Sequence, residues 1–108
     1  MSYYTPNRWV IVEVKSTEGT IRKVLGSWYG GYGGSDEWRL SSGITNVESK
    51  LDDKYPHYII HNESGSEYTC YEHSNGMSAY TASVYEDLKE KLAELGATIE
   101  IIDIKECI

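Results

Sequence analysis

The sequence predicts an α+β domain: an antiparallel meander sheet of about five to six strands, one helix packed on one face, and a final strand. Three observations lead to this prediction. Up to residue 73, apolar and polar residues alternate with the period of a strand, in short runs broken by Gly, Pro and Asn. After Met77 the period becomes that of a helix, and an Ile-rich alternating run closes the chain. The length of 108 residues fits a single domain spanning residues 1–108.

The first two strands are expected to form a hairpin. Arg8–Ser16 carries apolar side chains on both faces, because Trp9 and Ile11 alternate with valines at positions 10, 12 and 14. Thr20–Trp28 returns the chain after a Thr-Glu-Gly turn. The other strand candidates before the helix are Trp38–Leu40, Ile44–Glu48, His57–Asn62 and Glu67–His73. The last two flank Gly65, which is free to adopt a positive φ in a hairpin turn.

One stripe of apolar residues predicts the helix, through Tyr80, Val84, Leu88, Leu92 and Leu95. Ser83 and Glu86 fit a capping box, while Ser78 is a competing, earlier N-cap. Gly96 is a natural C′ residue. Thr98–Ile104 is then expected to be the final strand, with Ile99 and Ile101 facing away from Ile102 and Ile104.

The charge of the chain narrows its partners. The formal net charge is −7. Residues 41–108 have a net charge of −8, from five basic and thirteen acidic residues, and residues 1–40 have a net charge of +1. Direct nucleic-acid binding is not expected, because it depends on Lys and Arg neutralising phosphates. A basic protein surface is an easier partner, although many acidic proteins use their charge for solubility alone. No apolar run is long enough to cross a membrane, and the first residues lack the features of a signal peptide. Two cysteines are too few to indicate a disulfide scaffold, so a cytoplasmic location is expected.

A Gly/Tyr loop framed by two tryptophans is the first candidate binding element. Trp28 and Trp38 are expected to pair across two strands at its base, and Tyr29 and Tyr32 stand among four glycines within it. A phosphate-binding loop is not indicated, because acidic residues and then a strand follow where Lys, Ser/Thr and a helix are required. Rigid aromatics on an adaptable backbone resemble the chemistry of recognition loops. A purely structural turn is the alternative, and both interpretations stand.

A second candidate segment, Ser64–Tyr85, is dense in hydroxyl and amide groups. Tyr68, Tyr71 and Ser78 are its candidate binding residues, just before the predicted helix N-terminus, which attracts anions and hydroxyl-bearing ligands. The segment would form one polar and aromatic pocket if it converges with the Gly/Tyr loop. The alternative is a capped helix start without a ligand.

Metal binding and catalysis are not expected from the spacing of the reactive residues. His57 and His61 face the same side of a strand but stand about 13 Å apart, too far for one zinc ion. Cys70 and His73 differ by three positions, which places them on opposite faces of a strand unless a bulge intervenes. No nucleophile elbow is present. The sequence therefore predicts a non-enzymatic protein with no cofactor, no metal ligand and no catalytic residue.

Two stretches together resemble a known group of sequences. Trp28–Ile44 and Ser64–Val84 are similar to small uncharacterised proteins encoded by tailed bacteriophages. These combine W-Y-G-G, W-R-x-x-S-G-I and S-G-S-x-Y-x-C stretches with a G-M/L-S start to the last helix. The resemblance implies a context, the host cytoplasm, and no catalytic residue to carry over. Proteins of this kind commonly act by binding a host component, such as a defence nuclease, a polymerase or a signal molecule.

The leading hypothesis is a small acidic binding protein that inhibits or redirects a host protein, including an antiviral defence protein, through a Tyr/Trp/Gly surface. One alternative is a protein that sequesters a small molecule such as a nucleotide signal or a sugar. Another is a minor structural or assembly protein of the virion. Exposed edge strands leave homodimer formation open.

Overall fold

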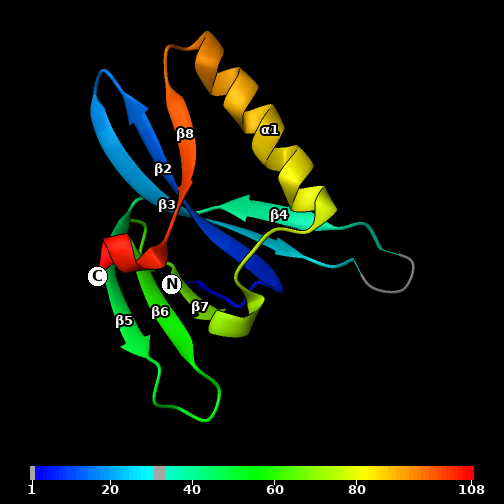
Figure 1. The fold of residues 1–108 in the computed structure, drawn as a ribbon, viewed down its shortest axis with the longest axis vertical. Helices are drawn as coiled ribbons and strands as arrows, with labels where there is room; N and C mark the ends of the chain where they lie inside the picture. Colours follow the sequence, from blue (N-terminus) through cyan, green and yellow to red (C-terminus); the bar gives the residue numbers. More distant parts are fainter. Residues whose placement is uncertain (1, 31–33) are drawn as a thin grey trace.

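The computed structural model describes residues 2–30 and 34–108, which form eight strands, one α-helix and two short 3-10 helices (Figure 1). The strands are β1 (Tyr3–Tyr4), β2 (Arg8–Ser16), β3 (Gly19–Trp28), β4 (Glu37–Leu40), β5 (Ile44–Lys50), β6 (His57–Asn62), β7 (Glu67–Tyr71) and β8 (Thr98–Ile102). The helix α1 is Ala79–Glu94, and the 3-10 helices are Glu72–Ser74 and Ile104–Cys107.

The strands belong to two four-stranded sheets with the orders β1-β7-β6-β5 and β4-β3-β2-β8. The α+β class and the single helix in the C-terminal half are confirmed. The prediction of one meander of five to six strands is wrong in its number of sheets and strands. The two-residue strand β1, which the sequence did not predict, lies parallel to β7, with Tyr3 opposite Glu67 and Tyr4 opposite Tyr68.

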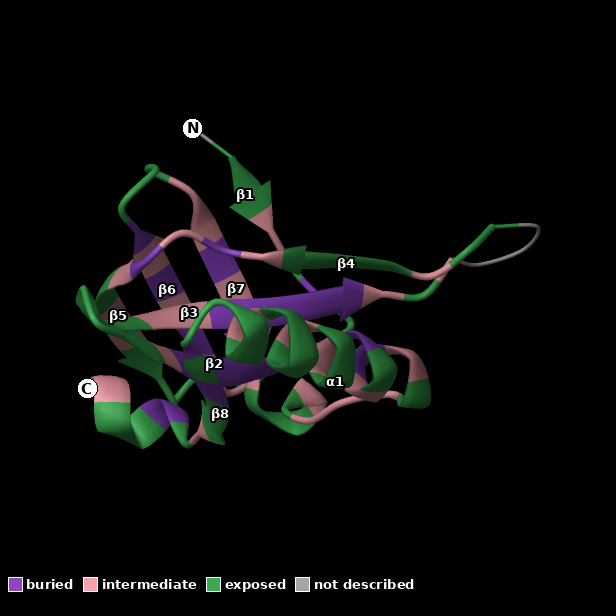
Figure 2. Ribbon diagram, turned by 90° about the horizontal axis from the view of Figure 1, so that it is seen from above, coloured by how far each residue is buried: buried purple, intermediate pink, exposed green. Residues whose placement is uncertain are grey.

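The second sheet exists because β2 is apolar on both faces. Val10 and Val12 pack in a cluster with Leu25, Val84 and Ile99, between the β4-β3-β2-β8 sheet and α1. Trp9 and Ile11 point the other way, into a cluster that includes residues 58, 60, 68 and 70 of β6 and β7. Figure 2 shows that the buried stretches concentrate in β2, β3, β6 and β7. One helix can cover only one face of a sheet, so the second face requires another layer.

Trp9 connects the two sheets directly. Its indole packs edge-on against Tyr58, with ring centroids 6.1 Å apart. Its Nε1–H donates a hydrogen bond to the carbonyl of Tyr71 over 2.7 Å, and its own carbonyl accepts from the amide of Gly76 over 2.8 Å. Burial of a Trp is favoured only where the N–H finds a partner, and here the end of β7 supplies it.

Ser41–Gly43, the gap between the predicted strands Trp38–Leu40 and Ile44–Glu48, is the point where the chain passes from one sheet to the other. The Ser41 hydroxyl accepts a hydrogen bond from the Val24 amide over 2.8 Å, and the Ser41 amide donates to the Val24 carbonyl over 2.9 Å. The Gly43 carbonyl then accepts from the Glu63 amide over 2.8 Å, beside β6. A Cβ on Gly43 would lie 2.9 Å from a carboxylate oxygen of Glu63, at the far end of a flexible side chain that can move aside.

Ser78, not Ser83, caps the helix. Its hydroxyl accepts from the Thr81 amide over 3.2 Å, which satisfies one of the free N–H groups of the first turn. The fully buried Thr81 hydroxyl donates to Ser27 of β3 over 2.6 Å and fixes the start of α1 on the sheet. Gly96 follows the helix with a φ of 76°, as its predicted C′ role requires.

The final strand is shorter than predicted. β8 ends at Ile102, and Asp103 caps the 3-10 helix by accepting a hydrogen bond from the Lys105 amide over 2.9 Å. The predicted alternation is confirmed within the strand by Ile99, which lies in the cluster under α1, and by Ile102, which packs against the cluster between the sheets. Ile104 is also buried between the sheets, but it belongs to the 3-10 helix. β8 pairs antiparallel with β2 at the edge of its sheet.

We predict that the Thr81–Ser27 hydrogen bond couples the helix to the sheet. Thr81→Val should lower the free energy of unfolding by about 1–3 kcal/mol, because it leaves the buried Ser27 hydroxyl without this partner. Ser27→Ala should cost less, because the Thr81 hydroxyl keeps Ser78 Oγ at 3.0 Å as a partner. The double variant should lose less than the sum, by at least about 0.5 kcal/mol. Urea unfolding of the four proteins measures this, and strictly additive losses would contradict the coupling.

Candidate binding site

The Gly/Tyr loop is held at its base by side chains that occupy its backbone amides. The Tyr29 amide donates to Asn7 Oδ1 over 2.9 Å, and the Gly30 amide donates to Asp36 Oδ1 over 3.0 Å. A Cβ on Gly34 would collide with the Gly30 carbonyl oxygen, so the two arms approach too closely for a larger residue. Because the Gly30 amide already donates to Asp36, it is not free to bind an anion.

The two tryptophans at the loop base do not form the predicted pair. Trp28 lies opposite Glu37 and Trp38 lies opposite Ser27, so the two indoles project from opposite faces of the β3–β4 ladder. Trp28 is half-buried: its Nε1–H donates to the Thr5 carbonyl over 3.0 Å, and its ring packs edge-on against Tyr4. Trp28 thus anchors the chain that precedes β2.

Among the described residues of the Gly/Tyr loop and its two flanking tryptophans, Tyr29 and Trp38 are the aromatic side chains that are exposed. Tyr29 is 56% exposed and Trp38 is 42% exposed. The described parts of the connection between β3 and β4, residues 29–30 and 34–36, lead away from the body of the molecule (Figure 2). Tyr32, the other aromatic predicted for this surface, lies outside the described residues.

Two adjoining hollows lie beside this arm and share Tyr4 and Arg39; together they are the Arg39 groove. The first has a volume of about 210 Å³ and is lined by Ser2, Tyr4, Arg39, Leu40, Ser41, Ser42, Ser64, Ser66 and Tyr68. The second has a volume of about 220 Å³ and is lined by Tyr4, Trp28, Glu37, Trp38 and Arg39. Ser42 thus meets Ser64 and Ser66 in the first hollow, whereas no described residue of the Gly/Tyr loop lines that hollow.

Arg39 is the cationic centre of the groove. Its guanidinium lies over the Tyr4 ring, 4.6 Å from the centroid, and none of the ion pairs among the described residues involves it. Burial raises the pKa of Tyr68 to about 12, although the nearby Arg39 charge acts in the opposite direction. A guanidinium held by an aromatic ring keeps its donors free for a carboxylate or a phosphate.

Serine hydroxyls line the same hollow as Arg39. The Ser64 amide donates to Ser42 Oγ over 3.0 Å, and Ser42 Oγ donates to Ser64 Oγ over 3.0 Å. The Ser64 and Ser66 hydroxyls lie 3.1 Å apart, and Asn62 Nδ2 donates to Ser66 Oγ over 3.2 Å. A hydroxyl can donate once and accept twice, so this chain retains capacity for a polar ligand.

The other predicted binding residues lie in three different environments. Tyr68 is 1% exposed and packs in the core between the sheets, with its edge on the groove. Tyr71 lies on the outer face of the first sheet, between the rings of His57 and His73. Ser78 caps α1. The structure therefore does not bring Tyr71 and Ser78 to the groove.

Sequence reasoning missed Tyr4 and Arg39, and it missed a second polar cluster. Arg39 lies within the W-R-x-x-S-G-I stretch, so the sequence could have indicated it as a candidate binding residue. Tyr4 gave no such signal, because its strand β1 has only two residues. The second cluster joins Glu48, His61 and Glu67 on the outer face of the β1-β7-β6-β5 sheet. The hydrogen bond from His61 lowers the pKa of the Glu48 carboxyl. The predicted β6–β7 hairpin is consistent with His61 lying opposite Glu67. The position of Glu48 beside them depends on the β5–β6 register, which contains a bulge.

The thiols differ in accessibility. Cys70 is fully buried between the sheets, and burial raises the pKa of its thiol well above the ordinary value. Cys107, near the end of the chain, is half-buried, and burial raises the pKa of its thiol as well. Cys70 and His73 do not meet, because His73 lies in the 3-10 helix after β7 and stacks on Tyr71.

Across residues 2–30 and 34–108, no helix combines the length and the apolar character needed to cross a bilayer. Comparisons with protein-family models, with curated proteins and with solved structures find no significant match.

We predict that a thiol reagent distinguishes the two cysteines. In the native protein Cys107 should react and Cys70 should be protected, because a buried protonated thiol is neither accessible nor nucleophilic. The aromatic disulfide DTNB should therefore release about one equivalent of its chromophore before denaturation and about two in guanidinium chloride. Cys107→Ser should reduce the native reaction to near zero. Rapid reaction of two native thiols would show that the core between the sheets opens.

Proposed function

We propose that this chain is a non-enzymatic binding protein that holds a partner protein through Tyr29, Trp38 and the Arg39 groove. The observation that carries the proposal is that exposed aromatic and cationic groups gather at one edge of the sheet. Trp38 and Arg39 are neighbours on the edge strand β4, Tyr29 directly follows β3, and Arg39 forms no ion pair among the described residues. Tyr, Trp and Arg are the residue types that most often dominate the energy of protein interfaces.

The edge strand β4 supports the same surface. β4 is the terminal strand of its sheet and pairs only with β3 among the described strands. Its free backbone groups can accept an extended segment of a partner, as in strand addition. The short length of β4, Glu37–Leu40, limits such pairing, so side-chain contacts from the groove would have to supply much of the affinity.

The nature of the partner follows from the resemblance to phage proteins. On that basis the partner is a bacterial host protein, and binding inhibits or redirects it. Arg39 would take an acidic side chain of that partner. The net charge of −7 favours a partner whose surface is otherwise basic, because opposite fields speed association.

We predict that Tyr29→Ala combined with Trp38→Ala abolishes partner capture from bacterial lysate and leaves the fold intact. Truncating interface aromatics commonly costs about 2 kcal/mol or more each, which is roughly a thirtyfold loss of affinity. Tyr55→Ala is the matched control, because Tyr55 is 60% exposed in the β5–β6 connection, away from the groove. Mass spectrometry identifies the captured proteins, and circular dichroism checks the fold. A partner that the double variant still holds would exclude this surface.

A second candidate function is capture of a small anionic or hydroxyl-rich molecule, such as a nucleotide or a sugar. The specific observation in its favour is the first hollow of the Arg39 groove, which combines one guanidinium, five serines and two tyrosine rings. Its volume of about 210 Å³ suits a phosphate or a single sugar rather than a large ligand.

For this second function, we predict that a matching ligand raises the melting temperature only while Arg39 is present. At a hundredfold excess over the Kd, stabilisation is about 2.7 kcal/mol, or roughly 10–20 °C. Inorganic phosphate, a mononucleotide and a hexose are the probes, each compared with chloride at equal ionic strength. Arg39→Gln should remove the shift caused by an anion, and Lys54→Gln should not. Equal shifts of the melting temperature in the parent and Arg39→Gln proteins would show general salt stabilisation and would contradict binding at Arg39.

A further inference from the structure

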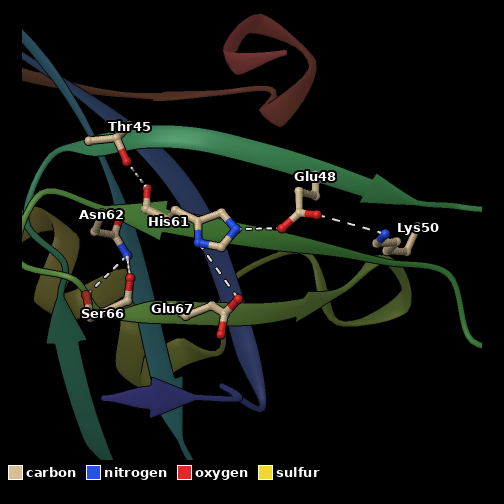
Figure 3. Close-up of polar contacts among 7 residues, drawn as sticks. All are labelled: Thr45, Glu48, Lys50, His61, Asn62, Ser66 and Glu67. Atoms are coloured by element: carbon tan, nitrogen blue, oxygen red, sulfur yellow. Dashed lines mark hydrogen bonds and ion pairs between the residues drawn. The ribbon is translucent and has the colours of Figure 1, made fainter. Parts of the chain in front are cut away.

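Three adjacent strands bring Glu48, His61 and Glu67 together on the outer face of the β1-β7-β6-β5 sheet (Figure 3). His61 lies on β6 between its two neighbours, β5 and β7. Glu67 of β7 is directly opposite His61, whereas Glu48 of β5 lies two residues along from Asn46, the residue opposite His61. The three side chains therefore share one face, as the period of two along a strand requires.

The distances place the three groups within reach of one ion. His61 Nε2 lies 2.6 Å from Glu48 Oε2, and His61 Nδ1 lies 3.8 Å from Glu67 Oε1. One ligand atom from each residue can be chosen so that all three lie within 4.8 Å of one another. Tetrahedral ligands at about 2.0–2.1 Å from a zinc ion are themselves about 3.3 Å apart. The contacts to Glu48 and Glu67 use different ring nitrogens, and one ion can bind only one of them. An ion at Nε2 lies beside Glu48, so the Glu67 side chain must rotate to bring a carboxylate oxygen to that side of the imidazole.

The surroundings fix the cluster without enclosing it. The Thr45 hydroxyl donates to the His61 carbonyl over 3.2 Å, and Lys50 Nζ lies 3.9 Å from Glu48 Oε1. The side chains of His61, Glu48 and Glu67 are 37%, 42% and 24% exposed. The three side chains therefore project from hydrogen-bonded strands, and one side of the cluster is open to solvent.

We propose that Glu48, His61 and Glu67 form a binding site for one divalent transition-metal ion, with Zn²⁺ as the best-matched probe. Two carboxylates balance the charge of the ion, and the imidazole favours a transition metal over Ca²⁺ or Mg²⁺. Three protein ligands with a solvent-facing side leave a coordination position for water or for a partner's side chain. The site is separate from the Arg39 groove and does not depend on the function proposed for it.

The competing interpretation is a metal-free ion-pair cluster, in which protonated His61 bridges the two carboxylates. The two interpretations differ in what His61 contributes to zinc affinity. The nearby His57 lies on the same face of β6 as His61, but it contacts the Tyr71 ring and the Tyr55 carbonyl and is not part of the cluster. His57 is therefore a matched control histidine for the experiment.

The test is isothermal titration of the full chain with ZnCl₂ in the Cys107→Ser background, which removes a competing free thiol. We expect one equivalent to bind, with His61→Ala lowering affinity at least tenfold and Glu67→Gln and Glu48→Gln each lowering it measurably. His57→Ala should bind like the parent. Circular dichroism should show that all variants keep the native spectrum, because the substituted side chains lie on a solvent-facing surface.

Three outcomes would overturn the proposal: no saturable zinc binding by the Cys107→Ser protein, unchanged affinity in His61→Ala, or a loss in His57→Ala equal to that in His61→Ala. Titration with MgCl₂ adds a further check. Binding of Mg²⁺ as tight as that of Zn²⁺ would show that the carboxylates act alone and would contradict the role given to the imidazole.

Discussion

The apolar character of β2 on both faces is the constraint on which the rest of this structure depends. Val10 and Val12 must be buried on one side, and α1 covers them together with β8 and β3. Trp9 and Ile11 must be buried on the other side, and only a second layer of structure can do this. The chain supplies that layer by leaving the first sheet after β4 and building β5, β6 and β7 across it. The helix then returns the chain to the first sheet for β8.

The candidate binding groove is a consequence of this two-sheet arrangement. β1 ends one sheet and β4 ends the other, and Tyr4 of β1 lies under Arg39 of β4 at the place where these edges meet. The passage Ser41–Gly43 between the sheets adds hydroxyl groups at the same place, and the β6–β7 turn adds Ser64. Edge strands are the positions where unpaired backbone and exposed side chains remain available. The candidate binding surface thus forms at the edge strands of the two sheets, whereas the space between the sheets is filled by core side chains.

Strand alternation lets β7 serve both faces of its sheet. Tyr68 points inward to the core and the groove, and its neighbour Glu67 points outward to His61. The same rule places Cys70 in the interior and Tyr71 outside, against His57. Consecutive residues therefore belong to different chemical environments, and the dense polar stretch Ser64–Tyr85 is divided among the groove, the outer face and the start of the helix. This division explains why the stretch does not form one pocket.

The sequence by itself determined most elements: the β2–β3 hairpin, the strands from Trp38 to Tyr71, the helix and its Gly96 stop, because periodicity and turn residues are local properties. It also showed that β2 is apolar on both faces. The separation of Trp28 and Trp38 onto opposite faces, the two-sheet division and the meeting of Tyr4 with Arg39 were decided only by the tertiary structure. These depend on register and on contacts between residues distant in sequence, and a shift of one residue reverses the face of every side chain. Glu48, His61 and Glu67 illustrate this, since each is unremarkable in its own strand and the three become a site only when three strands align.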